Sequence, residues 1–210
     1  MLKALFNFFM VLALVFSFII SVMLGAVFLG AAVLIAYIAV AERKAEIHDN
    51  WSILIESAKG RRDQIISMTK DFISEFKPPY LEMKEDKVGP RLAPAPIGET
   101  REFLIIIDRR SLKLGCFKTF VNAVDYGEAL FVSWYLTYMP DPWQTVASLV
   151  PGGRKAAGLE KLNLFDHQDL IAYVTCVHHC VQRATDKLML GLGQDPSRID
   201  RKSRGFLGIS

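Results

Sequence analysis

The chain has 210 residues, of which 51% are hydrophobic and 22% are charged, and its formal net charge is +3. A charge this small and this scattered argues against nucleic acid as a partner. The three cysteines (Cys116, Cys176 and Cys180) form no dense framework, which favours a reducing compartment over a disulfide-stabilised extracellular domain.

Residues 4–41 contain no Asp, Glu, Lys, Arg or His. A bilayer core takes roughly 20 apolar residues, so we predict a transmembrane anchor at 1–41. A cleaved signal peptide is the alternative, but its hydrophobic region spans only about 7–15 residues. One crossing is favoured over a hairpin, because the middle of the run offers Ser21 and Gly25 but no Pro, Asn or charge to form a turn.

Small residues recur at every fourth position of this run, at Ala13, Ser17, Ser21 and Gly25. Such a strip lets two helix backbones approach closely in lipid. We therefore expect Ser17, Ser21 and Gly25 to contact another membrane helix, in a different chain or in a homo-oligomer. Basic residues are more frequent after the run than before it, which places the C-terminal part in the cytoplasm.

A stalk helix is predicted at 42–76, continuous with the anchor. Trp51, Ala58, Ile65 and Phe72 recur at a seven-residue spacing, which gives this helix an apolar stripe. A partner helix, the chain's own domain or the membrane surface could cover the stripe, and we prefer the first two. Trp51, Ile65 and Phe72 are accordingly expected to make contacts.

Prolines end the stalk and define a linker at 77–101. Pro78 and Pro79 stop the helix because proline lacks the backbone donor and restricts the residue before it. Pro90, Pro94 and Pro96 then punctuate a segment with few large apolar residues. We expect an extended linker without a folded element.

The next segment predicts a β-hairpin followed by a helix. The β-branched run at 103–107 suits a buried strand, and 112–121 is the second strand candidate. Asn122 can cap a helix that continues through Met139 and stops at Pro140. This helix is apolar nearly all round, so it lies in the core, against a partner or against lipid headgroups. Its aromatic contact candidates are Trp134 and the nearby Trp143.

A last long helix is predicted at 166–190, ending at Gly191. Its apolar positions form one stripe: Leu170, Val174, Val177, Val181, Ala184 and Leu188.

The same helix carries the one cluster with metal-ligand chemistry, Cys176, His179 and Cys180, on one flank of that stripe. Structural zinc sites draw four ligands, usually from two chain segments, so Cys116, His167 or another chain would have to supply the fourth. Zinc is the cofactor that this reading implies. A Cys–His nucleophile is also conceivable, but no orienting third group can be named. Structural roles in a packed helix are the simpler interpretation, which implies no cofactor.

These elements predict a membrane-anchored, mainly α protein. A transmembrane helix (1–41) continues into an amphipathic stalk helix (42–76), followed by a proline-rich linker (77–101). A small α+β domain (102–190) then contains a β-hairpin and two long helices, and a basic tail (191–210) is solvated.

From this organisation we expect a non-enzymatic, membrane-anchored subunit of a multiprotein membrane assembly. Its partners are the lipid bilayer and other membrane-protein chains, with a homo-oligomer included. The alternative is a membrane-tethered metal-binding or redox protein that uses the Cys/His cluster. A third interpretation is a lipid-binding domain that uses the aromatic helix and the basic tail.

Overall fold

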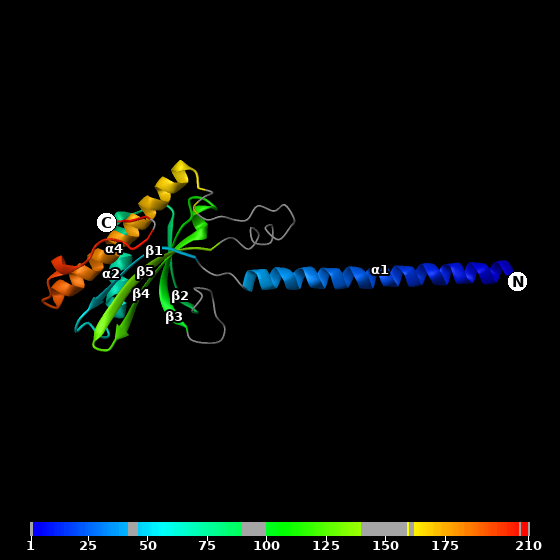
Figure 1. Cartoon of the computed structure of the whole chain (residues 1–210), viewed down its shortest axis with the longest axis horizontal. Helices are drawn as coiled ribbons and strands as arrows, with labels where there is room; N and C mark the ends of the chain where they lie inside the picture. Colours follow the sequence, from blue (N-terminus) through cyan, green and yellow to red (C-terminus); the bar gives the residue numbers. More distant parts are fainter. Residues whose placement is uncertain are drawn as a thin grey trace.

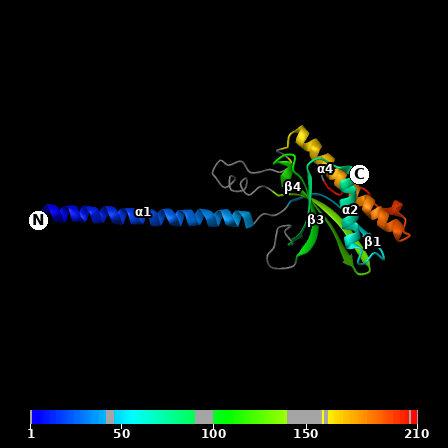
Figure 2. The same ribbon diagram turned by 180° about the vertical axis from the view of Figure 1, so that it is seen from behind.

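The computed structural model describes residues 2–41, 46–89, 100–139, 159, 162–205 and 207–209. These residues form an N-terminal helix and a domain in which a five-stranded antiparallel sheet carries two helices on one face (Figures 1 and 2). The predicted mainly α fold is therefore wrong. The protein is a small α+β protein with three α-helices in its described part, and one of them, at the N-terminus, is a candidate for crossing a membrane.

Helix α1 (Leu2–Ala41) is uninterrupted over 40 residues and runs through Gly25 without a turn. Figure 1 shows it extending away from the domain as a single rod. Its segment Val15–Val33 has a mean hydropathy of 2.4, and none of this segment is buried against the rest of the protein. By length and composition this helix can cross a membrane, and a signal sequence at the same place would meet the same criteria.

Strand β1 (Glu46–Ile55) occupies the first part of the predicted stalk helix. It pairs antiparallel with β5 (Ala129–Tyr138), and Trp51 and Ile55 on its inner face are buried. A helix across 42–76 is wrong because the chain turns between the two parts of this segment. Ser57 and Gly60 both have positive φ, 53° and 74°, which ends regular structure there.

Helix α2 (Arg62–Phe76) forms the second part of the predicted stalk. Its end is as predicted: Lys77 adopts the left-handed conformation that closes a helix, and two prolines follow. The apolar stripe packs inside the chain's own domain, since α2 contacts both α4 (Leu164–Gly191) and β4 (Phe117–Tyr126). The residues at the seven-residue spacing are indeed packed into the domain. They belong to β1, to α2 and to the turn between them, which the prediction had combined into one helix.

Strand β2 (Leu81–Val88) lies where an extended linker was expected. It pairs in register with β3 (Arg101–Asp108) and forms one edge of the sheet. Its sequence Leu-Glu-Met-Lys-Glu-Asp-Lys-Val is mostly charged, as natural edge strands often are. The prolines at 90, 94 and 96 lie outside the described residues.

The predicted hairpin between residues 103–107 and 112–121 is confirmed as the antiparallel pair β3–β4, in which Leu104 faces Val121. A short 3-10 turn, η1 (Leu114–Cys116), precedes β4.

The helix predicted from Asn122 to Met139 is wrong. This segment forms the end of β4 and the whole of β5, which pair from Phe117–Tyr138 to Tyr126–Ala129. Gly127, with φ of 65°, opens the two-residue turn between them, as a tight hairpin turn requires.

Helix α4 confirms the predicted last helix and begins with a capping box between Asn163 and Asp166. Tyr173 fastens it to the sheet: its hydroxyl donates to the Ile106 carbonyl at 2.6 Å and accepts from the Thr119 amide at 3.0 Å. Burial raises the pKa of Tyr173, so this hydroxyl keeps its proton. The sheet order is β1-β5-β4-β3-β2, and α2 and α4 lie side by side over its inner face (Figures 1 and 2).

The C-terminal tail is not solvated as expected. After α4 it forms a 3-10 turn, η3 (Pro196–Arg198), and then runs back between α4 and the outer edge of β1. Ser203 and Ile209 in this tail are buried, with exposed fractions of 9% and 6%.

Candidate partner-binding groove at the edge of strand β1

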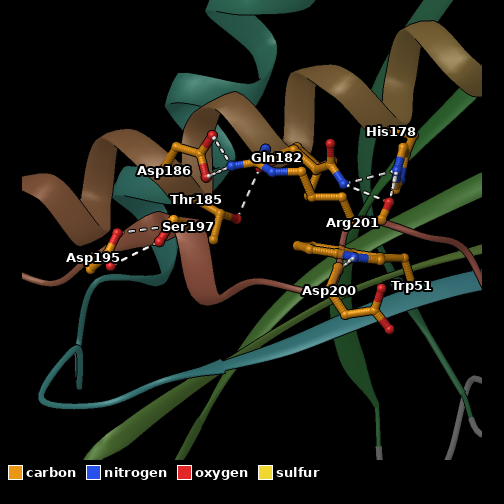
Figure 3. A network of polar contacts seen from close by, with 10 residues as sticks. Trp51, His178, Gln182, Thr185, Asp186, Asp195, Ser197, Asp200 and Arg201 are labelled. Carbon is orange, nitrogen blue, oxygen red and sulfur yellow. Dashed lines mark hydrogen bonds and ion pairs between the residues drawn. The ribbon is translucent and has the colours of Figure 1, made fainter. Parts of the chain in front are cut away.

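Strand β1 is the second edge of the sheet, and the C-terminal tail lies beside it (Figure 3). Three sets of contacts hold the tail in place. They come from α4, from the start of β1 and from the two ends of the tail segment, and they decide which part of the strand edge stays open.

The first contact set centres on His178, which is fully buried on α4. The Trp134 indole donates to His178 Nδ1 at 3.0 Å, and an indole nitrogen can only donate. Nδ1 is therefore unprotonated, and the proton of the neutral ring sits on Nε2, which donates to the Arg201 carbonyl at 2.8 Å. The Gln182 side-chain amide donates to the same carbonyl at 2.9 Å (Figure 3).

The electrostatic environment keeps His178 neutral. Burial is the main cause that lowers the pKa of His178, and the nearby charges of His179 and Arg201 lower it further. The hydrogen bond to the Arg201 carbonyl and the charge of Asp49 act in the opposite direction. A neutral ring can accept from Trp134 and donate to the tail at the same time, so it ties sheet, helix and tail together.

The second contact set seals the beginning of β1. Asp49 is fully buried and accepts from the Ser203 hydroxyl at 3.0 Å and from the Asn50 amide at 2.8 Å. The Arg204 amide donates to the Asn50 carbonyl at 2.8 Å. A Cβ on Gly205 would lie 2.4 Å from the Asp49 Cα, so the tail reaches β1 only because a glycine is present. Asp49 and Asn50 form the sealed half of the edge.

The third contact set lies on either side of η3. The Trp51 indole donates to the Asp200 carbonyl at 2.7 Å, and Figure 3 shows both residues beside β1. The Gln194 side-chain amide donates to the Glu56 carbonyl at 2.6 Å, just beyond the end of the strand. The tail is thus held at Trp51 and at Glu56, on either side of the stretch from Ser52 to Leu54.

The direction of the backbone groups on that stretch follows from the strand geometry. The Asn50 carbonyl points away from β5, because it accepts from the tail. Every second residue of a strand has its amide and carbonyl on the same side, so Ser52 and Leu54 also point their backbone groups outward. The described part of the chain provides no outer hydrogen-bond partner for either residue. Ser52 to Leu54 form the open half of the edge.

A groove of about 650 Å³ lies between the open half and the tail. Three acidic residues (Glu56, Asp195 and Asp200) and one basic residue (Arg198) line it. Hydrogen bonds from the Ser197 amide and hydroxyl lower the pKa of Asp195, and the charge of Arg198 adds to this. The groove therefore carries a net negative charge beside unpaired backbone groups.

The Cys/His cluster is only partly brought together. The thiols of Cys176 and Cys180, one turn apart on α4, share a hydrogen bond that lowers the pKa of Cys176 to about 7 and raises that of Cys180. His179 points to solvent from the same helix. Within the described residues, no group of three His, Cys, Asp or Glu side chains could hold a metal ion.

The residues selected as partner contacts fall into two sets. Ser17, Ser21 and Gly25 are exposed on α1. Trp51, Ile65 and Trp134 are buried in the core of the domain, Phe72 is partly buried and covered by the Arg183 guanidinium at 4.2 Å, and Trp143 lies outside the described residues.

The edge groove was not predicted, because residues 46–55 were assigned to a helix and the tail to solvent. The available signal of a strand was the short run from Trp51 to Ile55, which is rich in aromatic and β-branched residues and is interrupted only by Ser52. Comparisons with known proteins give no guide here: no family model, no curated protein and no solved structure matches the chain.

Proposed function

We propose that the chain is a membrane-anchored, non-enzymatic subunit of a multiprotein membrane assembly. Helix α1 makes helix–helix contacts in the bilayer, and the domain contacts a partner outside it. The observation that carries the proposal is the open half of the β1 edge, Ser52 to Leu54, on a domain joined to a long apolar helix.

An open strand edge is a site where another chain can add a strand, and native proteins usually cover or charge such edges. Here the opposite edge strand, β2, is mostly charged, and the first half of the β1 edge is sealed by the tail. The short open stretch from Ser52 to Leu54, beside a groove lined by acidic residues, is therefore typical of an edge that binds another chain.

In the bilayer, Ser17, Ser21 and Gly25 support the same function. They lie one turn apart on one side of α1, and a Cβ on Gly25 would meet no atom within 4 Å. In lipid, small residues at this spacing allow close packing of a second helix. That helix belongs to another chain of the assembly or to a second copy.

The domain faces the cytoplasm in this proposal. Basic residues follow α1 at Arg43 and Lys44, against Lys3 before it, and the three cysteines are free thiols. Protease treatment of sealed, right-side-out cells tests this: the domain is protected if it is cytoplasmic, and digestion without permeabilisation contradicts the assignment.

The test of the assembly itself is purification from the native membrane in a mild detergent, followed by identification of the chains that co-purify in fixed stoichiometry. We expect defined partners, and we expect their loss when Ser17, Ser21 and Gly25 are all changed to Leu. The matched control changes Ile19, Met23 and Val27, on the opposite side of α1, to Leu. A chain that purifies alone and monomeric contradicts the proposal.

Metal analysis of the same preparation addresses the metal-binding alternative. Stoichiometric zinc or iron that is lost in Cys176→Ser would favour that alternative over an assembly subunit.

A further inference from the structure

We propose that the open half of the β1 edge binds an extended segment of a partner protein in which basic and apolar side chains alternate, and that this segment adds to the sheet as a short sixth strand. This inference rests on the proposed function, since the segment belongs to the partner that the domain contacts outside the membrane.

The backbone groups define the length of the site. Ser52 and Leu54 present two amides and two carbonyls at a spacing of about 6.8 Å along the strand. The Asn50 carbonyl on one side is taken by the Arg204 amide, and the Glu56 carbonyl on the other is taken by Gln194. Only the stretch between them can pair with an incoming chain, so the site accepts about three residues in register.

The charges of the groove select the side chains of the segment. Glu56, Asp195 and Asp200 outnumber Arg198, and backbone amides of Ser197 and Lys202 donate to the two aspartates and orient them. Side chains of an added strand alternate between the two faces of the sheet. Those facing the tail meet the carboxylates, so they are basic.

The opposite face of the sheet selects apolar side chains. The Leu54 side chain lies there, away from Trp51 and Ile55, and is 49% exposed. An apolar residue of the segment on that face would cover Leu54. Basic and apolar residues therefore alternate along the preferred segment.

A second copy of this chain fits the site poorly. Pairing two β1 edges would bring two copies of Glu56, Asp195 and Asp200 close to each other. Like charges across an interface oppose association. The sealed half would also be an obstacle, because the tail of each copy occupies the edge at Asn50.

The test uses the full chain in non-ionic detergent and a fluorescent ten-residue peptide of alternating Lys and Val. We expect saturable binding by fluorescence anisotropy, and slower hydrogen exchange of the Ser52 and Leu54 amides when the peptide is bound. The matched peptide of alternating Glu and Val should bind at least about tenfold more weakly. A Lys/Val peptide with N-methylated valines, which cannot donate from those positions, is expected to bind more weakly than one with N-methylated residues only at its ends.

On the protein side, Leu54→Pro removes an outward amide and should weaken binding about tenfold, whereas Leu54→Ile keeps both backbone and apolar contact and should not. If Leu54→Pro does not fold, the double variant Asp195→Asn with Asp200→Asn tests the same site. We expect it to bind the Lys/Val peptide more weakly than the unchanged protein.

Three results would overturn this inference: no binding of the Lys/Val peptide, equal binding of the Glu/Val peptide, or exchange protection of Ser52 and Leu54 that rises with protein concentration alone. The last result would identify a second copy as the occupant. Each of these results leaves the assembly proposal standing if defined partners still co-purify. Failure of the edge-binding inference can therefore be distinguished from failure of the assembly proposal.

Discussion

The two halves of the β1 edge differ in what covers them, although they belong to one continuous strand. In the sealed half, buried Asp49 and the carbonyl of Asn50 are bonded to the tail. In the open half, the outward groups of Ser52 and Leu54 face a groove that is lined by acidic residues. The tail passes both halves, but it forms hydrogen bonds with the backbone of the sealed half only.

The difference shows that coverage of a sheet edge depends on a few specific contacts and is not a general consequence of a nearby chain segment. Sealing requires a buried acceptor, a matching hydroxyl from Ser203 and a glycine that permits close approach. Around the open half, the tail instead uses Gln194 and Asp200 to bond beside the exposed groups. The tail therefore maintains the groove.

Proline substitution on adjacent residues gives the largest contrast. Ile53 directs its amide toward β5, where it faces Val132, so Ile53→Pro removes a ladder hydrogen bond and should lower the free energy of unfolding by about 3 kcal/mol or more. Leu54→Pro removes only an outward amide and should cost less than about 1 kcal/mol. Urea unfolding followed by tryptophan fluorescence measures both. Equal losses would show that the direction of the backbone groups has been assigned incorrectly.

Removal of the His178 side chain tests the contact between helix, sheet and tail. His178→Ala leaves the Trp134 indole without its acceptor, removes one of the two donors to the Arg201 carbonyl and creates a cavity, so we expect a loss of about 2–3 kcal/mol. His179→Ala is the matched control: its side chain is exposed on the next position of α4, and its effect should stay within about 0.5 kcal/mol. Similar small losses in both variants would contradict the role of this contact.

Substitution of Gly205 breaks the sealed half selectively. Gly205→Ala places a Cβ against the Asp49 backbone and should release the end of the tail at a cost of about 1–2 kcal/mol. Gly191→Ala, at the end of α4, meets no atom within 4 Å and should be neutral or slightly stabilising. In the Gly205 variant, faster exchange of the Arg204 amide is expected, and unchanged exchange would argue against a tight contact.

Mild acidification should lower the free energy of unfolding through His178. Because the pKa of His178 is lowered in the folded protein, the unfolded chain binds a proton first as the pH falls below about 6.5. Stability should therefore decrease between pH 6.5 and the lower folded pKa, with a slope of at most about 1.4 kcal/mol per pH unit, and show no further loss from this group below it. Urea unfolding at several pH values measures the slope. His178→Ala should lack this component, and an unchanged slope in that variant would assign it to another group.

Strongly periodic or strongly punctuated segments could be predicted from the sequence. Helix α4 has a long stripe and an end signal, and α1 has an uninterrupted apolar run. The end of α2 before Pro78 was also predictable, because proline acts locally. The strand at 103–107 was found because its β-branched residues form a short buried run.

The two strands that were predicted as helix, β1 and β5, were misassigned for a common physical reason. Strands β1 and β5 bury apolar residues on the inner face and also carry apolar residues on the outer face, so their pattern is not a clean alternation. Gly127 in the β4–β5 turn was the local signal that separates a hairpin from a helix. The groove could not be predicted, because it depends on residues about 140 positions apart, such as Gln194 and Glu56.

Residue-resolved amide hydrogen exchange on the full chain in detergent tests the open edge most directly. Four consecutive amides, Trp51 to Leu54, should alternate: Ser52 and Leu54 exchange at least about a hundredfold faster than Trp51 and Ile53, which bond to β5. Uniform protection of all four amides in the isolated monomeric chain would contradict an open binding edge on this domain.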